Sequence, residues 1–303
     1  MKTPKSLQKG DTVAIAAPAR KVSEEELMPA TSLLESWGLR VVLPDGLFAA
    51  DNQFAGDDDT RAALLQRLLD DDAVQAILCA RGGYGTVRIL DKLDFSHFVE
   101  HPKWIIGYSD ITVLHSHIQR HWGIETLHAT MPINIPDDAV GTPYPATETL
   151  RQALFGETLG YRFDAHPLNR PGAASGTVVG GNLSILYSLC GSPSDLSTNG
   201  KILFIEDLDE YLYHIDRMMA NLKRCGHLSN LAALVVGQMS DMHDNAVPFG
   251  HTAEEIILDK VQEYGYPVCF GLPMGHNGTE NRALVLGREA TLTVGREVTL
   301  NYL

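Results

Sequence analysis

The sequence predicts an α/β protein with two domains, a parallel-sheet domain followed by a smaller mixed α/β domain. In the first half, short apolar runs alternate with helix-like segments, as where "TVAIAAPA" precedes "SEEELMPATSLLESWG". Such alternation is typical of parallel strands covered by helices. Near residues 160–176 the pattern gives way to "YRFDAHPLNRPGAASG", which is polar and rich in Pro and Gly. We therefore expect domains over 1–160 and 176–303, joined by a linker at 161–175.

The elements of the first domain follow from short apolar runs and helix-end signals. One helix is expected to begin after Ser23, because Glu26 three residues on completes a capping box, and to end at Gly38. Further strands are expected in "RVVLPD", "AVQAILCA" and "KWIIG", and further helices in "DDDTRAALLQRLLDD", "TVRILDKL" and "DITVLHSHIQRHW". Ligands on parallel sheets gather beyond the carboxyl ends of the strands, where "RGGYG" and "GYSD" fall.

The second domain mixes strand and helix patterns. Strands are expected in "KILFIED" and "LAALVVGQM", and helices in "YHIDRMMANLKRCG" and "TAEEIILDKVQEYG". The last stretch, "RALVLGREATLTVGREVTLNYL", alternates apolar and polar residues about Gly287 and Gly295. This alternation predicts a β-meander at the end of the chain.

The charge balance excludes several classes of partner. Twenty-four Lys and Arg against 38 Asp and Glu give a formal net charge of −14, which opposes binding to nucleic acid or to an anionic membrane surface. The N-terminal apolar stretch "VAIAAPA" is too short for a secretory signal, and no run of about 18 apolar residues occurs. We therefore expect a cytoplasmic protein.

The cysteines and histidines match no recognised metal motif. The four cysteines are scattered along the chain, at Cys79, Cys190, Cys225 and Cys269. Reduced, buried thiols are expected from this pattern, rather than disulfides or metal ligands. One helix carries His115, His117 and His121, but no H-E-x-x-H pattern accompanies them, so histidines on a helix surface are expected. We expect neither a metal nor a cofactor.

Ser109 stands between an expected strand and an expected helix in "IIGYSDITVL". A serine on such a turn projects its hydroxyl above the sheet, and the amide of the next residue can stabilise an oxyanion. The second glycine of G-x-S-x-G is missing. A helix cap at Ser109 or Asp110 is therefore the alternative interpretation.

A reactive serine also needs a base and an orienting carboxylate. His276 lies in the glycine-rich loop "GLPMGHNG", after a strand-like run, where the alternative is a solvated loop histidine. Glu206 and Asp207 end an apolar strand; Glu206 fits the orienting role, whereas Asp207 could cap a helix. The chain order Ser109, Glu206, His276 is that of α/β-hydrolases.

The loop "ARGGYGTV" offers backbone amides close to a second expected strand end. Its three glycines leave the backbone accessible to an anion, although the loop matches neither common phosphate-binding motif. A second oxyanion donor beside Ser109 is the better interpretation. Arg81 at the start of this loop could bind a substrate carboxylate, or form a surface ion pair.

Five segments in this order, "ARGGYGTVRIL", "IIGYSDITVL", "VVGGNLSIL", "ILFIEDLDE" and "GLPMGH", resemble those of the LD-carboxypeptidases. This serine peptidase family, S66, includes muramoyltetrapeptide carboxypeptidase. The resemblance implies a flavodoxin-like N-terminal domain, a smaller C-terminal domain and an active site between them. It implies Ser109 as nucleophile, Glu206 as acid and His276 as base, with the amides of Gly83 and Asp110 as oxyanion hole.

The resemblance also implies an activity. Family members remove the terminal D-alanine from cytoplasmic muropeptide tetrapeptides during peptidoglycan recycling, which implies a small muropeptide substrate and a homodimer. A related branch hydrolyses peptide-nucleotide antibiotics and tends to carry an extra loop; only 70 positions separate Glu206 from His276, which favours recycling. A general serine esterase and a solute-binding protein are the rivals. Arg81 and Asn182 are candidates for binding the substrate carboxylate, and the preferred diamino acid stays open.

Overall fold

The first sheet lies in the N-terminal half and is mainly parallel. In the computed structural model, which describes residues 2–303, its strand order is β11-β5-β4-β3-β1-β2. Its strands are β1 Thr12–Ala16, β2 Arg40–Val42, β3 Ala76–Cys79, β4 Trp104–Gly107, β5 Thr126–His128 and β11 Leu284–Leu286. Strands β1 to β5 run parallel, and β11 pairs antiparallel with β5. The expected parallel α/β architecture is confirmed.

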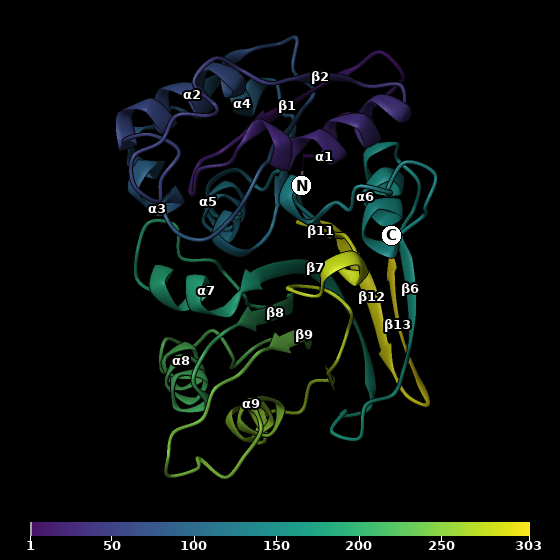
Figure 1. Cartoon of the computed structure of the whole chain (residues 1–303). Helices are drawn as coiled ribbons and strands as arrows, with labels where there is room; N and C mark the ends of the chain where they lie inside the picture. Colours follow the sequence, from purple (N-terminus) through teal and green to yellow (C-terminus); the bar gives the residue numbers. More distant parts are fainter. Residues whose placement is uncertain (1) are drawn as a thin grey trace.

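Helices surround this sheet (Figure 1). They are α1 Glu24–Ser36, α2 Asp58–Asp70, α3 Thr86–Ile89, α4 Ser96–Glu100, α5 Thr112–Trp122 and α6 Pro145–Leu154, with 3-10 turns η1 Leu90–Lys92, η2 Ser109–Ile111 and η3 Pro132–Asn134. The capping box of α1 is formed: the Glu26 amide donates to Ser23 Oγ at 3.3 Å, and the Ser23 amide donates to Glu26 Oε2 at 2.8 Å.

The second sheet is mixed and lies beside the first (Figure 1). Its order within residues 2–303 is β10-β9-β8-β7-β12-β13-β6. Its strands are β6 Gly160–Asp164, β7 Gly172–Asn182, β8 Ile202–Leu208, β9 Ala233–Ser240, β10 Val268–Cys269, β12 Glu289–Val294 and β13 Glu297–Tyr302. Strands β7 to β10 run parallel to one another. Strands β12, β13 and β6 follow on the other side of β7, and each pairs antiparallel with its neighbour. The remaining helical elements are α7 Leu183–Leu189, α8 Leu212–Arg224, α9 Ala253–Val261 and η4 Gly278–Glu280.

The segment 161–175, expected as a linker, is mostly strand. It holds most of β6 and the start of β7, so only residues 165–171 connect the two. Pro167 and Pro171 fall in that connection, whereas Gly172 and Gly176 lie in β7. By contrast, Tyr161 is buried and its hydroxyl donates to the Ala283 carbonyl, which ties β6 to the body of the protein.

The expected C-terminal meander is also divided. Strands β12 and β13 form a hairpin, but β11 pairs with β5 in the first sheet, with Leu284 opposite His128. All three residues of β11 are buried, whereas β12 and β13 alternate between buried and accessible residues. A short run that is apolar at every position fits a strand covered on both faces, which the first sheet provides.

One apolar core joins the two halves. The same cluster of buried side chains includes Trp104 and Leu127 from the first sheet, and Phe204 and Leu292 from the second. The chain also passes between the sheets at β11. The two halves are therefore packed against each other rather than tethered by a flexible segment.

The start of α5 meets the end of β7 at this junction. The amide of Asn182 donates to Thr112 Oγ1 at 3.0 Å, in a buried position. Gly181 has a φ of +142°, and a Cβ there would lie 2.5 Å from Thr112 Oγ1. The absence of a side chain at Gly181 therefore allows α5 to approach β7, which brings "GYSD" toward the second domain.

Several expectations about single residues need correction. Cys225 is exposed at the end of α8 and Cys190 is only partly buried, although Cys79 and Cys269 are buried as expected; all four are free thiols in residues 2–303. His115 is fully buried rather than on the helix surface, and its Nε2 lies 2.9 Å from the Gly107 carbonyl. Within residues 2–303 no helix combines the length and apolarity needed to span a bilayer.

The junction gives a prediction about stability. Thr112→Val removes the oxygen that accepts from the buried Asn182 amide while keeping the side-chain shape. We expect the free energy of unfolding to fall by about 1–3 kcal/mol, because a buried donor is left unsatisfied. Urea unfolding of Thr112→Val and of the control Thr112→Ser, which keeps the hydroxyl, measures the difference. Equal stability of the two variants would contradict this role.

Candidate active site

Ser109 sits on a strained turn between strand and helix. Strand β4 ends at Gly107, Tyr108 is extended, and η2 begins at Ser109 and leads into α5. Ser109 has a φ of +61°, a left-handed conformation that is uncommon for a residue with a side chain. Such strain costs of order 1–3 kcal/mol and concentrates at functional sites. The strand-turn-helix context expected for Ser109 is confirmed.

The glycine loop "RGGYG" packs directly against this turn. A Cβ on Gly82 would lie 2.9 Å from both Cβ and Oγ of Ser109. The neighbouring Gly83 has a φ of +101°, and its amide donates to no acceptor within residues 2–303. The loop therefore offers an unused backbone donor close to the Ser109 hydroxyl.

Asp110 holds the loop to the turn. Its buried carboxylate accepts a hydrogen bond from the Thr86 amide at 2.8 Å, at the start of α3. Burial raises the pKa of Asp110, and the hydrogen bonds from Thr86 offset part of that rise. The Asp110 side chain thus caps α3, the helix that follows the glycine loop, rather than a helix of its own segment. Its backbone amide lies at the start of η2, where 3-10 turns lack an internal acceptor.

Glu206 and His276 form a buried hydrogen-bonded pair. His276 Nδ1 lies 2.7 Å from Glu206 Oε2, and the Glu206 side chain is fully buried while that of His276 is 14% exposed. Because a carboxylate only accepts hydrogen bonds, Nδ1 carries the proton and donates to Glu206. This assignment leaves Nε2 as the basic nitrogen of a neutral ring.

Two glycines allow the His276 loop to reach Glu206. The β8–β9 pairing is irregular next to Glu206, and there the Gln238 amide donates to the Met274 carbonyl at 3.0 Å. A Cβ on Gly237 would lie 2.4 Å from the Met274 oxygen. Gly275 has a φ of +115°, and a Cβ on it would lie 2.7 Å from Glu206 Oε2. A side chain at either position would push the loop away.

The ring of Tyr108 links the Ser109 turn to His276. The Tyr108 and His276 rings meet edge to face, with centroids 4.8 Å apart. The Tyr108 hydroxyl donates to Asn134 Oδ1 at 3.0 Å, which fixes the ring. Among residues 2–303 Ser109 and His276 are not directly hydrogen-bonded. Catalytic hydrogen bonds are often long without substrate and tighten when it binds.

The environment of His276 favours its charged form. Burial works to lower the pKa of His276, but the hydrogen bond and charge of Glu206, together with the charge of Asp207, outweigh it and raise the pKa above its usual 6.5. Behind it, His128 is fully buried, and burial followed by the neighbouring His115 and His276 lowers its pKa well below the usual value. His128 is therefore neutral and adds no competing charge.

Asn182 and Arg81, the two candidates for carboxylate binding, are already engaged. Asn182 caps α7 by accepting from the Ile185 amide, and its Nδ2 donates to Asp207 Oδ1 at 2.9 Å. Arg81 Nη1 lies 3.2 Å from Glu26 Oε1, in the surface ion pair that the sequence left as an alternative. Both side chains have protein partners where a substrate ligand was expected.

Sequence reasoning missed Arg20. Its side chain crosses Gly83, so that a Cβ there would lie 2.2 Å from Arg20 Cδ and 3.5 Å from Nε. Arg20 is exposed, and within residues 2–303 its guanidinium has neither an ion pair nor a hydrogen bond. The position of Arg20 just beyond the end of β1 could have identified it, since ligands of parallel sheets bind at the carboxyl ends of the strands.

Comparison with known proteins identifies the family. The LD-carboxypeptidase N-terminal domain model matches residues 13–129, and the LD-carboxypeptidase C-terminal domain model matches residues 175–292. The chain therefore belongs to the LD-carboxypeptidase family. It is 39% identical over 304 residues to the probable murein peptide carboxypeptidase of Bacillus subtilis, covering 98% of this chain and 93% of that protein.

Solved structures share the same two-domain fold. The crystal structure of muramoyltetrapeptide carboxypeptidase from Oxalobacter formigenes has a TM-score of 0.86 and 27% identity, covering 96% of this chain and 98% of that one. The microcin C7 self immunity protein MccF, in complex with aspartyl sulfamoyl adenosine, has a TM-score of 0.85 at 20% identity, covering 98% and 97%. At that identity the second likeness concerns the fold alone.

The approach of Gly275 to Glu206 gives a second prediction. Gly275→Ala places a methyl group on the Glu206 carboxylate in a backbone region that L-residues avoid. We expect the His276–Glu206 hydrogen bond to be disrupted and the free energy of unfolding to fall by roughly 1–3 kcal/mol. The imidazole proton resonance of His276 reports the hydrogen bond, and Gly265→Ala, where the added methyl meets open space and φ is not positive, is the control. An unshifted resonance in Gly275→Ala would refute this account.

Proposed function

We propose that this protein is a serine L,D-carboxypeptidase that removes the terminal D-alanine from muropeptide tetrapeptides during peptidoglycan recycling. The observation that carries the proposal is the buried Glu206–His276 pair beside the strained Ser109 turn. Family membership, and relatives named as a probable murein peptide carboxypeptidase and a muramoyltetrapeptide carboxypeptidase, support a carboxypeptidase role in muropeptide processing. We also propose that the enzyme acts in the cytoplasm, on muropeptides that are being recycled, and that it acts as a homodimer.

The proposed reaction is acyl transfer through Ser109. Ser109 Oγ attacks the carbonyl that precedes D-alanine, and Nε2 of His276 takes the hydroxyl proton. His276 then gives that proton to the departing amine, which leaves an acyl group on Ser109. Water, deprotonated by Nε2 of His276, then attacks the acyl carbon; the bond to Ser109 Oγ breaks, His276 returns the proton to Oγ, and the shortened peptide leaves. Glu206 fixes the ring tautomer and stabilises the imidazolium that forms.

The proposed oxyanion hole uses two backbone amides. The developing negative charge on the carbonyl oxygen would accept hydrogen bonds from Gly83 and Asp110. The Asp110 carboxylate keeps these two donors together, since it ties the turn to the residue that follows the loop. Losing one such donor typically costs about 10²–10³ in turnover.

The substrate carboxylate is assigned to Arg20 in this proposal, ahead of Arg81. A free guanidinium can bind a carboxylate with two parallel hydrogen bonds, whereas Arg81 would first have to leave Glu26. The cation is also needed because the protein carries a net charge of −14 and the substrate is anionic.

Substitution of Ser109 tests the reaction class. Ser109→Ala is expected to abolish loss of one alanine from a muropeptide tetrapeptide, read by mass spectrometry, with the fold unchanged by circular dichroism. Wild-type turnover of a peptide-nucleotide conjugate with an intact tetrapeptide would favour the immunity activity instead. Rapid hydrolysis of simple esters without regard to D-alanine would favour a general esterase.

The His276–Glu206 pair predicts the pH profile. A general base must be neutral, so kcat/KM is expected to fall as pH drops through the raised pKa of His276, with its midpoint above 6.5. Glu206→Gln removes the charge that raises this pKa, so the midpoint should move to lower pH while kcat falls by roughly 10³–10⁴. An unchanged midpoint in Glu206→Gln would show that Glu206 does not influence the group whose titration sets the pH profile.

Arg20 and Arg81 give a matched comparison. Arg20→Gln is expected to raise KM for the tetrapeptide by about tenfold or more, because a charge-assisted contact to the substrate is lost. A tetrapeptide with an amidated terminus should show no difference between wild type and Arg20→Gln. If Arg81→Gln raises KM more than Arg20→Gln does, the assignment to Arg20 is wrong.

A further inference from the structure

A second group of reactive side chains lies away from the Ser109 turn. We propose that Cys190, Asp195 and His227, here called the thiol-histidine cluster, bind a divalent zinc-type cation. The Sγ atom of Cys190, a carboxylate oxygen of Asp195 and a ring nitrogen of His227 all lie within 4.8 Å of one another. The cluster is at the carboxyl end of α7, roughly 10 Å along the helix from Asn182.

Three separate segments meet at the cluster. Cys190 is the C-cap of α7 and Cys225 the C-cap of α8, with His227 two residues further on. Asp195 comes from the connection between α7 and β8. The spacing in the chain matches no zinc motif, which is why the sequence predicted no metal here.

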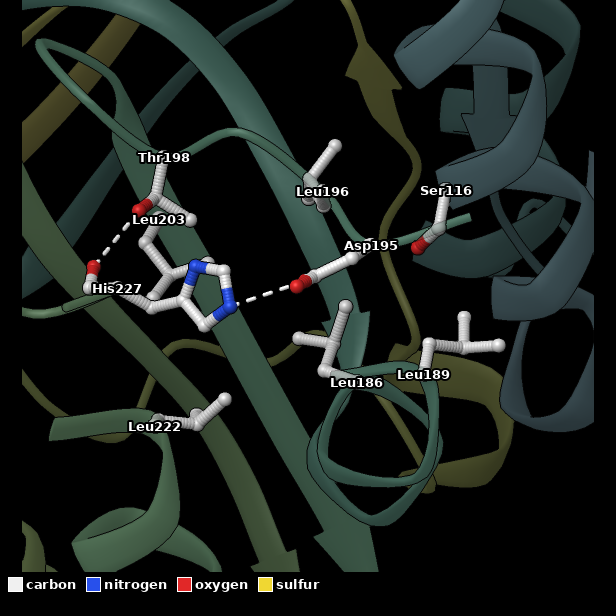
Figure 2. Close-up of a pocket in the computed structure, with 9 residues that line it drawn as sticks. All are labelled: Ser116, Leu186, Leu189, Asp195, Leu196, Thr198, Leu203, Leu222 and His227. Carbon is white, nitrogen blue, oxygen red and sulfur yellow. Dashed lines mark hydrogen bonds and ion pairs between the residues drawn. The ribbon is translucent and has the colours of Figure 1, made fainter. Parts of the chain in front are cut away.

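Asp195 and His227 are in close contact without forming a hydrogen bond. Oδ1 of Asp195 lies 2.9 Å from Nε2 of His227, yet the two groups do not meet the geometry of a hydrogen bond. Nε2 of His227 is thus a buried nitrogen without a hydrogen-bond partner in residues 2–303. Figure 2 shows the imidazole and the carboxylate directed toward each other. A cation bound by both would satisfy both groups.

The Cys190 thiol supplies the third ligand. Cys190 is partly buried, and its Sγ makes one weak hydrogen bond, to the Leu186 carbonyl at 3.5 Å. Burial, followed by the neighbouring Cys225 and Asp195, raises the pKa of Cys190 to about 12. A metal ion deprotonates a coordinating thiol. One thiolate, one imidazole and one carboxylate are ligand types that suit zinc, and water can occupy the fourth position.

The surroundings hold these ligands in place. The other carboxylate oxygen of Asp195 accepts from the Gly191 amide at 2.8 Å, and the His227 carbonyl accepts from Thr198 Oγ1 at 2.7 Å. Leucine side chains line the pocket beside the cluster, as Figure 2 shows: Leu186, Leu189, Leu196, Leu203 and Leu222. Outer hydrogen bonds that orient ligands and an apolar wall are typical of structural metal sites. A bound cation would join α7 to α8 and stabilise the second domain.

A second group of metal-ligating side chains serves as a control. Asp72, His97 and His101 also have ligand atoms within 4.8 Å of one another, but Asp72 and His101 are exposed and the group has no thiol. Any cation held there would lack a sulfur ligand. Thiolate absorption therefore separates the two sites.

Cobalt titration of the full-length protein, kept reduced with a phosphine, tests the proposal. One equivalent of Co²⁺ should produce sulfur-to-cobalt charge-transfer absorption in wild type and in the His97→Ala, His101→Ala double variant. Cys190→Ser should lose it, and the control Cys225→Ser, which keeps all three ligands of the cluster, should retain it. His227→Gln should weaken Co²⁺ binding by at least tenfold.

Stability gives an independent readout. Saturating Zn²⁺ should raise the thermal midpoint of wild type by roughly 5 °C and leave that of Cys190→Ser unchanged. Circular dichroism confirms that each variant is folded before titration. Absence of thiolate absorption in reduced wild type would overturn the proposal. So would absorption and affinity in His227→Gln equal to those of wild type, since His227 would then not be a ligand.

Discussion

The buried hydrogen bond between Glu206 and His276 is the interaction on which the rest of the site depends. An ionised carboxylate removed from water costs several kcal/mol unless it is paired. Glu206 is fully buried, and its Oε1 has no hydrogen-bond partner within residues 2–303, so His276 at Oε2 is its principal compensation. The loop that carries His276 is therefore held by charge as well as by backbone contacts. The same pairing raises the pKa of the His276 ring. The position of the loop and the acid–base behaviour of His276 therefore depend on one contact.

Close backbone approaches bring the two domains to this pair. Gly82 lets the glycine loop touch Ser109, Gly181 lets β7 touch the start of α5, and Gly275 lets the histidine loop touch Glu206. At each point a single methyl group would collide with a polar atom of the opposing element. The left-handed φ of Ser109 is the one strained side-chain position among these contacts. Packing of both domains at this junction holds Ser109 in its strained conformation.

Two adjacent carboxylates on β8 show how strand geometry assigns roles. Successive side chains of a strand point to opposite faces, so Glu206 turns toward His276 and Asp207 toward the start of α7. Burial, with the charge of Glu206 next, raises the pKa of Asp207 to about 7. Asp207 is stabilised by donors from Asn182 and Ser184 instead of a cation. Each acid thus has its own partners, although the residues are neighbours in the chain.

The sequence by itself determined the local features: the alternation of strands and helices, the capping box at Ser23 and the turn at Ser109. Each depends on residues a few positions apart, whose preferences act in any context. The family resemblance implied that His276 and Glu206 share one site, although nothing local in the sequence brings them together. Only the tertiary structure decided that Arg20 crosses Gly83 and that β11 joins the first sheet. The thiol-histidine cluster is of the same kind, since Cys190 and His227 come from different helix ends. Such contacts depend on how whole elements pack, because shape and burial select among partners that the chain keeps far apart.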